Sequence, residues 1–411
     1  MSLGFYIILA AQFFSALADN ALLFAAIALL KTLHAPDWQV PVLQQFFIFS
    51  YIVLAAFVGA FADALPKGRV MFISNSIKFV GCLAMLMGMH PLPAYGLVGF
   101  GAAAYSPAKY GILTEYLPPD KLIWANGWME GLTVTSIIVG AIMGGFLITP
   151  QVAMPLLAVF DIPGFETGID TAPEFAIGIV TVLYIIAAIF NLYIPKVGID
   201  HKPLKRNPLY IIHDFWHCFK LLWRDPLGQV SLAVTTLFWG AGATLRLIIL
   251  TWASTALLMP LEKATLLTAW VAFGIAIGSI IAAKYVKLES SVRVLPVGIA
   301  MGFLVIAMIF VSNVWVATTL LVIVGAMAGF FVVPMNALLQ HRGHLLMGAG
   351  HSIAVQNFNE NLSILLMLGA YALMIKWGWT INVIVIVFGV FVSAVMGWLY
   401  KLHGAAKLPT P

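Results

Sequence analysis

A small set of ionisable side chains interrupts the otherwise apolar stretches of this sequence. They are Asp19, Lys78, Lys109, Glu130, Arg246 and Glu360. A charge at the centre of a membrane-spanning helix costs at least about 2.5 kcal/mol on insertion scales, so each residue is expected to face a partner or a water-filled cavity. Acidic and basic groups together would line such a cavity with separate binding positions for cationic and anionic groups.

The position of each charge along its apolar run predicts its depth in the membrane. At about 1.5 Å per residue, the outer half holds Asp19 and Arg246, and the inner half holds Lys78, Lys109 and Glu130. Internal ion pairs, Asp19 with Arg246 and Lys109 with Glu130, are one interpretation, and the binding of a charged ligand is the other. A ligand can compete for a paired charge, so the two are compatible. Arginine in particular suits bidentate recognition of phosphate.

The composition indicates which elements must position these charges. Of the 411 residues, 62% are hydrophobic and 9% are charged, against roughly 25% charged in an average soluble domain. Lipid must therefore surround the chain. Crossing about 30 Å of hydrocarbon takes about 20 apolar residues per helix, and long continuous runs predict helices, not a barrel. The expected spans are 3–30, 43–62, 70–89, 94–115, 122–147, 174–195, 228–258, 263–285, 292–311, 315–338, 350–375 and 379–401.

These runs predict an all-α membrane protein with about twelve transmembrane helices in two six-helix pseudo-repeats. Basic residues concentrate in alternate loops, which places both termini in the cytoplasm. The longest inner loop, 196–227, would separate an N-terminal half, 1–195, from a C-terminal half, 228–411. Superimposing the halves aligns Pro107 with Pro334, as expected of internal repeats.

The 196–227 segment carries a pattern of its own. Large apolar residues recur at three- and four-residue spacing beside two cations: Leu209, Ile212, Trp216, Phe219 and Trp223 with Lys220 and Arg224. This pattern predicts an interfacial amphipathic helix, and its cations suit the anionic inner leaflet. A solvated linker helix and a contact with a partner protein remain open. His213 and His217 share a helical face, but no further cluster supports a metal site.

The segment between the second and third spans holds the most distinctive local motif, Gly59-Ala-Phe-Ala-Asp63-Ala-Leu-Pro-Lys67-Gly-Arg69. Gly59 allows close approach of two helices, and Asp63 can pair with a cation or with a helix N-terminus. We therefore predict a conformational latch formed by Gly59, Asp63, Lys67 and Arg69. An ordinary charged turn at the membrane surface is the alternative. Histidines near loop ends, among them His351, are expected at the surface.

No set of residues predicts catalysis, a cofactor or a metal. The sequence contains no Gly-x4-Gly-Lys-Ser/Thr nucleotide loop and no Ser/His/Asp or Cys/His set on neighbouring spans. Cys82 and Cys218 lack the spacing of a metal or redox pair. The distribution of basic residues indicates membrane orientation and not a nucleic-acid partner. Transport by such a chain would follow a gradient, an ion or the removal of product.

Several longer strings resemble one family. They are Ser15-Ala-Leu-Ala-Asp19-Asn20-Ala-Leu-Leu-Phe24, Gly101-Ala-Ala-Ala-Tyr-Ser-Pro107-Ala-Lys109-Tyr-Gly111, Leu237-Phe-Trp-Gly-Ala-Gly-Ala-Thr-Leu-Arg246, Gly329-Phe-Phe-Val-Val-Pro334-Met-Asn336-Ala-Leu-Leu-Gln340 and Ala354-Val-Gln356-Asn357. They resemble the bacterial lysophospholipid transporters of the major facilitator superfamily. The resemblance runs from the first span to the last and includes the embedded charges themselves.

The resemblance implies the major facilitator fold in the inner membrane of a Gram-negative bacterium. It implies a flippase that carries lysophosphatidylethanolamine and related lysolipids from the outer to the inner leaflet, where an acyltransferase-acyl carrier protein synthetase re-acylates them. The substrate-binding residues would be Asp19, Asn20, Lys109, Asn126, Glu130, Arg246, Gln356, Asn357 and Glu360. The cations would meet the phosphate, the acids the ammonium, and the amides the glycerol and ester oxygens.

Two other functions remain open. A proton-coupled exporter of amphiphilic drugs or small solutes would use the same fold, with Asp19 or Glu360 as the proton carrier. A scaffold or receptor that transports nothing would dock the acyltransferase through 196–227. Dependence of uptake on a proton gradient would favour the exporter, and loss of lysolipid movement in partner-free liposomes would favour the scaffold.

Overall fold

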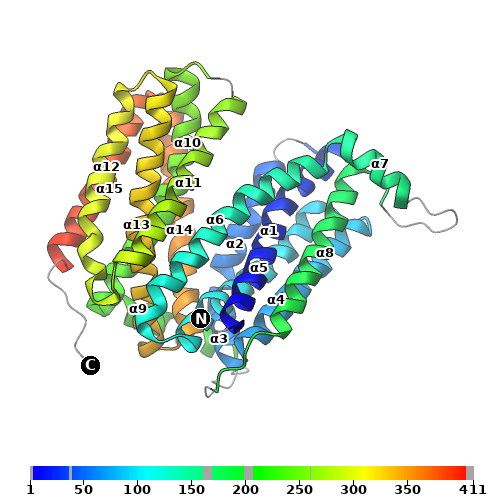
Figure 1. Cartoon of the computed structure of the whole chain (residues 1–411), viewed down its shortest axis with the longest axis horizontal. Coiled ribbons are helices and arrows are strands. Elements are labelled where there is room, and N and C mark those ends of the chain that lie inside the picture. Colours follow the sequence, from blue (N-terminus) through cyan, green and yellow to red (C-terminus); the bar gives the residue numbers. More distant parts are fainter. Residues whose placement is uncertain (1–2, 37–38, 161–168, 199–206, 260, 404–411) are drawn as a thin grey trace. The chain divides into compact units, whose positions relative to one another are not determined.

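The structure is a computed structural model that describes residues 3–36, 39–160, 169–198, 207–259 and 261–403. Residues 199–206 of the expected linker lie outside this part of the chain. The α-helices are α1 (Leu3–Thr32), α2 (Gln39–Val53), α3 (Ala55–Ala64), α4 (Lys67–Leu86), α5 (Pro91–Tyr116), α6 (Leu122–Leu147), α7 (Pro150–Phe160), α8 (Ala172–Leu192), α9 (Pro208–Arg224), α10 (Pro226–Ala256), α11 (Leu261–Tyr285), α12 (Leu295–Ile306), α13 (Val314–Leu346), α14 (Ala349–Lys376) and α15 (Ile381–His403) (Figure 1). Short 3-10 helices cover Pro119–Lys121, Leu288–Val294 and Ala307–Phe310.

Ten of the described helices are long and apolar enough to cross a membrane, or eleven spans are present if α2 and α3 together form one. These two helices meet at an angle of 66° around Leu54. The segment expected to span at 43–62 is therefore broken into two helices at this bend. Hydropathy did not reveal the break, because the residues on both sides of it are apolar.

Two further helices differ from the sequence-based expectation. The 11-residue helix α7 was not expected, since it is too short to cross a bilayer. Helix α13 continues to Leu346, beyond the expected end at 338. Its additional turns hold Gln340, a buried polar residue that finds its hydrogen-bond partner inside the protein. A polar stretch therefore prolongs this helix instead of ending it.

The chain divides into two compact units. The first comprises residues 1–115, 135–215 and 349–354, and the second comprises 116–134, 216–348 and 355–411. In the first unit, α1 and α4 pack against α8. In the second unit, α11 packs along α13, and α12 packs on α15. A Cβ atom at Gly278 of α11 would collide with the backbone of Ala326 of α13, so this glycine permits the close approach of the two helices.

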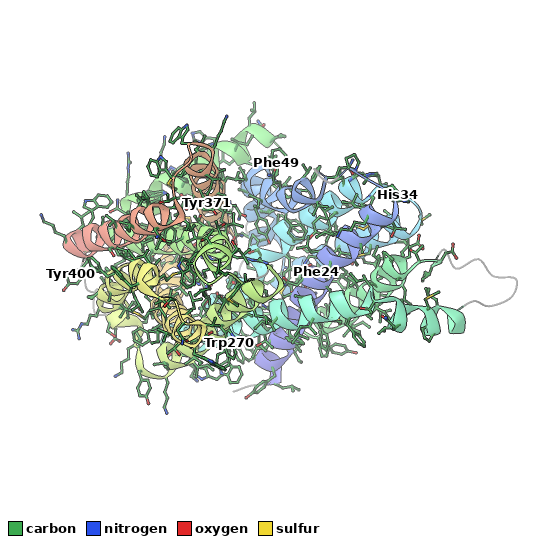
Figure 2. All side chains as sticks on the ribbon, turned by 90° about the horizontal axis from the view of Figure 1, so that it is seen from above. Phe24, His34, Phe49, Trp270, Tyr371 and Tyr400 are labelled. Carbon is green, nitrogen blue, oxygen red and sulfur yellow. The ribbon has the colours of Figure 1, made fainter. Side chains whose placement is uncertain are left out.

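Large apolar side chains lie on the outside of the helices as well as in the core. Phe49, Trp270 and Tyr400 are exposed (Figure 2). This surface suits contact with lipid, because the outer solvent of a membrane protein is itself apolar.

The helix starts show how the chain satisfies unpaired backbone N–H groups. Thr171 and Glu174 form a capping box at the start of α8, and Asp225 accepts a hydrogen bond from Gly228 N at the start of α10. Helix α14 differs, because its N-cap is Gly348, which has a φ of 106° and no side chain. The first N–H groups of α14 therefore need an acceptor from elsewhere in the chain.

Candidate functional site

The carboxylate of Asp19 on α1 is held by two other helices of the first unit. Lys78 on α4 donates to both oxygens of Asp19, at 2.9 and 2.8 Å, and the hydroxyl of Tyr184 on α8 donates to Oδ1 at 2.6 Å. The Lys78 side chain is 1% exposed and the Asp19 side chain 23%. The two charges neutralise each other inside the unit, while the acid keeps a partly accessible edge.

The surroundings of Lys78 are built to receive its side chain. Its ammonium donates to Ser15 Oγ at 3.1 Å and lies 4.8 Å from the centre of the Tyr105 ring. Ser15 in turn donates to Asn75 at 2.8 Å. A Cβ atom at Gly101 would lie 2.7 Å from Lys78 Cγ, so the absence of a side chain at this position leaves room for the lysine.

Lys78 was predicted as an embedded charge without a function, and Arg246 was one predicted partner of Asp19. The structure pairs Asp19 with Lys78. Depth counted from Cα positions placed these two residues in different halves of the membrane. A lysine side chain is long and flexible, so its ammonium can reach well beyond the level of its own Cα.

A second polar cluster connects α6, α13 and α14 in the second unit. Asn336 Nδ2 donates to Glu130 at 3.2 Å, and Asn336 Oδ1 accepts from Gln356 at 3.0 Å. Gln356 Nε2 also donates to Glu360 at 2.7 Å. All four side chains are buried. The carboxyl groups of Glu130 and Glu360 are thus linked through the side-chain amides of Asn336 and Gln356. The hydrogen-bond donor to Glu360 in this chain is the neutral amide of Gln356.

Two other predicted binding residues make amide hydrogen bonds. The side chains of Asn126 on α6 and Gln340 on α13 exchange hydrogen bonds of 2.9 and 2.8 Å, next to the Glu130 cluster. Asn20 donates to the carbonyl of Ala16, one turn earlier in α1, at 2.7 Å. Neither Asn336 nor Gln340 was predicted as a site residue. Their type and their position in an apolar run were the available signal.

The remaining predicted residues differ in exposure. Lys109 on α5 is buried, and its ammonium lies 4.5 Å from the centre of the Tyr110 ring. Asn357 on α14 is also buried. Arg246 is exposed, although it lies about two-thirds of the way along the apolar helix α10. An exposed arginine at such a position has to face water or a polar ligand, because lipid tails cannot solvate it.

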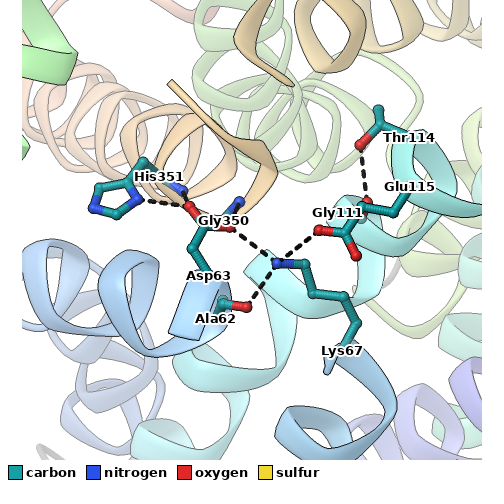
Figure 3. Close-up of polar contacts among 8 residues, drawn as sticks. All are labelled: Ala62, Asp63, Lys67, Gly111, Thr114, Glu115, Gly350 and His351. Carbon is teal, nitrogen blue, oxygen red and sulfur yellow. Dashed lines mark hydrogen bonds and ion pairs between the residues drawn. The ribbon is translucent and has the colours of Figure 1, made fainter. Parts of the chain in front are cut away.

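The latch motif meets the uncapped start of α14, in the first unit (Figure 3). Asp63 Oδ1 accepts from Gly350 N at 2.6 Å, and Oδ2 accepts from His351 N at 3.0 Å. Lys67 lies 2.9 Å from Asp63 and 3.0 Å from Glu115. One carboxylate therefore caps a helix that has no side-chain cap of its own and also pairs with a buried lysine.

Two glycines allow this contact, and one predicted latch residue stays outside it. A Cβ atom at Gly59 would lie 2.8 Å from Ala354 Cβ, and one at Gly350 would lie 2.6 Å from Asp63 Oδ1. Both positions therefore depend on the absence of a side chain. Arg69 is exposed on α4.

The prediction that His351 lies at the surface is wrong. Its side chain is 7% exposed, Nδ1 lies 2.6 Å from Asp63 Oδ2, and Nε2 lies 3.4 Å from Asp214 on α9. Position near a loop end was a misleading signal, because the loop end is itself packed against the latch. Glu115, a second acid in contact with Lys67, was also missed.

Replacing Asp63 with asparagine will lower the stability of the protein. Asparagine has one acceptor oxygen where the carboxylate has two, and it leaves Lys67 with Glu115 as its remaining acid. Hydrogen bonds to charged groups contribute roughly 1.5–3 kcal/mol each, so we expect a loss of about 3 kcal/mol. Thermal unfolding in detergent measures it. Asp120→Asn, at an exposed position, is the matched control, and equal melting temperatures for the two variants would contradict the prediction.

The helical architecture agrees with comparison to known proteins. The sequence pattern of the Major Facilitator Superfamily matches residues 8–366. The chain belongs to the Major Facilitator Superfamily. As a member of this superfamily it is a multi-pass membrane transporter and not an enzyme.

Close relatives of this superfamily member are known. It is 43% identical over 379 residues to the lysophospholipid transporter LplT of Yersinia enterocolitica serotype O:8 / biotype 1B. The matched region covers 92% of this chain and 89% of the relative. It is 44% identical over 372 residues to LplT of Yersinia pestis (strain Pestoides F), covering 90% and 86%.

Solved structures share the fold at low sequence identity. A bacterial homologue of the iron transporter ferroportin, in an outward-facing state, has a TM-score of 0.72 at 15% identity and covers 97% of this chain and 100% of its own. The human organic anion transporter MFSD10 has a TM-score of 0.73 at 12% identity, covering 98% and 100%. At such identities the likeness concerns the major facilitator fold alone.

Proposed function

We propose that this chain is a lysophospholipid transporter. The observation that carries the proposal is the identity of 43–44% to the Yersinia proteins named lysophospholipid transporter LplT, over about nine-tenths of the chain. The embedded residues fit such a substrate, because a lysophosphatidylethanolamine head group carries both a phosphate and an ammonium. Acidic and basic side chains are both available in the apolar helices to meet them.

The proposed direction is from the outer to the inner leaflet of the Gram-negative inner membrane. Lysophosphatidylethanolamine and related lysolipids would move by alternating access, with the two halves rocking about the head group while the acyl chain stays in apolar surroundings. Re-acylation by an acyltransferase-acyl carrier protein synthetase on the cytoplasmic side would remove the product and set the direction. The transporter would act as a monomer and need no cofactor.

The proposed topology has twelve spans with both termini in the cytoplasm. Ten helices plus the α2–α3 pair make eleven spans, and α5 would be the twelfth. At about 1.5 Å per residue its 26 residues extend about 39 Å, enough to cross about 30 Å of hydrocarbon. Residues 1–195 and 228–411 would form the two halves, joined by 196–227.

The phosphate is assigned to Arg246, with Lys109 as the second cation. Arg246 is exposed about two-thirds of the way along α10, so its guanidinium is available to a ligand. Its planar fork of donors matches the oxygens of a phosphate bidentately. The amides of Asn20, Asn126, Gln356 and Asn357 would meet the glycerol and ester oxygens.

The ammonium is assigned to Glu360 in preference to Asp19. Asp19 already accepts from Lys78 and Tyr184, so its negative charge is compensated within the first unit. Glu360 is bonded to the neutral amide of Gln356. A ligand cation would therefore gain more binding free energy at Glu360 than at Asp19. The amides of Gln356 and Asn336 would connect the bound cation to Glu130.

Flipping of labelled lysophosphatidylethanolamine by the purified protein in liposomes tests the proposal. Protein-dependent flipping without a proton gradient is the expected result, because product removal would supply the driving force. No flipping with or without a gradient would overturn the lysolipid assignment. Flipping that needs a gradient would keep the assignment of lysolipid as the substrate and would indicate Glu360 as a proton carrier.

One observation favours a second candidate function. A buried carboxyl group bonded to a neutral amide, as Glu360 is, could take up a proton as readily as it could bind a ligand cation. A proton-coupled exporter of amphiphilic drugs or small solutes would use it in this way. Such an exporter would depend on the proton gradient and change little when Arg246 or Lys109 is replaced.

A further inference from the structure

Helix α9 carries large apolar side chains that are exposed or partly exposed in the described part of the chain. Leu209 is 75% exposed, Ile212 39% and Trp216 44%. A neighbouring stripe of the same helix is packed, with Phe215 and Leu222 at 3% and 0% exposure. Exposing three large apolar side chains on one side of a helix to water is costly, so the surroundings of this side are expected to be apolar at least in part.

The aromatic residues of α9 show where it lies relative to a long membrane helix of the second unit, and Trp216, although partly exposed, takes part in this contact. The ring centres of Trp216 and Phe219 lie 5.9 and 6.2 Å from that of Phe358 on α14. Trp223 Nε1 donates to the side chain of Asn359 at 3.3 Å. At about 1.5 Å per residue, Phe358 lies about 13 Å along α14 from its start at Ala349. Helix α9 therefore packs against the flank of α14 and does not merely extend from its end.

The C-terminal end of α9 is also fixed close to a membrane helix. Asp225 follows α9 directly, caps α10 through Gly228 N, and accepts from Arg342 Nε of α13 at 3.0 Å. Since α10 starts at Pro226, the last turn of α9 lies at the level where a span begins. A helix at this level meets the lipid head groups.

The charges of α9 indicate which lipids these are. Lys220 and Arg224 are exposed near its C-terminal end, and His213 and His217 are exposed along it. The acid of α9, Asp214, lies 3.4 Å from His351 and so faces a basic group of the protein. An exposed surface that combines aromatic and aliphatic side chains with cations is complementary to an anionic bilayer surface.

We propose that the Leu209–Ile212–Trp216 face of α9, with Lys220 and Arg224, binds the anionic phospholipids of the leaflet that borders it. The apolar side chains insert at the level of the glycerol and upper acyl chains, and the two cations contact the phosphates. This surface is distinct from the embedded charges, so the proposal does not depend on which solute the transporter carries.

Site-specific fluorescence in reconstituted full-length protein tests the proposal. The native thiols, Cys82 and Cys218, are buried, so Ile212→Cys or Leu209→Cys can be labelled selectively with a small environment-sensitive fluorophore. We expect nitroxide-labelled lipids to quench the label at least twofold more strongly than aqueous iodide does. Lys121→Cys, at an exposed position outside α9, is the control, and iodide should quench it more strongly. A label at position 212 that iodide quenches and lipid does not would overturn the proposal in favour of a solvated helix, and a label protected from both would overturn it in favour of protein packing.

The anionic preference has its own test. Lipid quenching at position 212 should increase at least twofold when phosphatidylglycerol replaces part of the phosphatidylcholine in the vesicles. Combining the label with Lys220→Glu and Arg224→Glu should abolish this increase. The melting temperature should stay unchanged, because both cations are exposed. The same increase in the double-glutamate variant would show that these cations do not select the lipid, and the proposal would then fail.

Discussion

Replacing Arg246 with alanine will reduce flipping of lysophosphatidylethanolamine by roughly tenfold to a hundredfold. Arg246 is exposed about two-thirds of the way along an apolar helix, where we assign its guanidinium to the substrate phosphate. Charge-assisted hydrogen bonds contribute about 1.5–3 kcal/mol, and each 1.4 kcal/mol corresponds to a factor of ten. Initial flipping rates in liposomes, normalised to the amount of folded protein, measure the loss.

Two further variants separate this role from a general effect of charge. Arg246→Lys keeps the charge but loses the planar fork, so it should retain an intermediate rate. Arg293→Ala removes an arginine from an exposed position in the 3-10 helix Leu288–Val294 and should leave flipping unchanged. If Arg246→Ala binds and flips lysolipid like the unmodified protein, the phosphate assignment is wrong.

Replacing Lys78 with methionine will destabilise the protein by about 3 kcal/mol. The ammonium bonds both oxygens of Asp19 from a site with 1% exposure. Removing it leaves a negative charge that is stabilised by the hydroxyl of Tyr184 and by solvent at its partly accessible edge. Breaking one side of a buried ion pair costs about 3–5 kcal/mol, and the 23% exposure of Asp19 places this pair at the lower end. Thermal unfolding in detergent measures the change.

The double variant Lys78→Met, Asp19→Asn gives the decisive comparison. Removing both charges eliminates the unpaired carboxylate, so most of the lost stability should return. Lys287→Met, at an exposed position, should have little effect. If the double variant is less stable than Lys78→Met, the pair does not act as a compensated unit.

The amino-acid sequence by itself determined the helical architecture and the inventory of embedded charges. Long apolar runs predicted the helices to within a few residues at many of their ends; α6, for example, covers the expected 122–147. Such runs are a local property, because each span must satisfy its own backbone hydrogen bonds in lipid. The same reasoning marked six ionisable residues as unusual, since an ionisable residue in an apolar run is visible without knowledge of its neighbours. They are Asp19, Lys78, Lys109, Glu130, Arg246 and Glu360.

Only the tertiary structure decided which of these groups meet. The pairing of Asp19 with Lys78 depends on the lateral order of α1, α4 and α8 and on the reach of a lysine side chain. The burial of His351 depends on Asp63 capping a helix whose own N-cap is a glycine, from a position far away in the sequence. Spacing along one helix fixes which residues share a face, whereas contacts between helices depend on rotation and packing, which no single segment encodes.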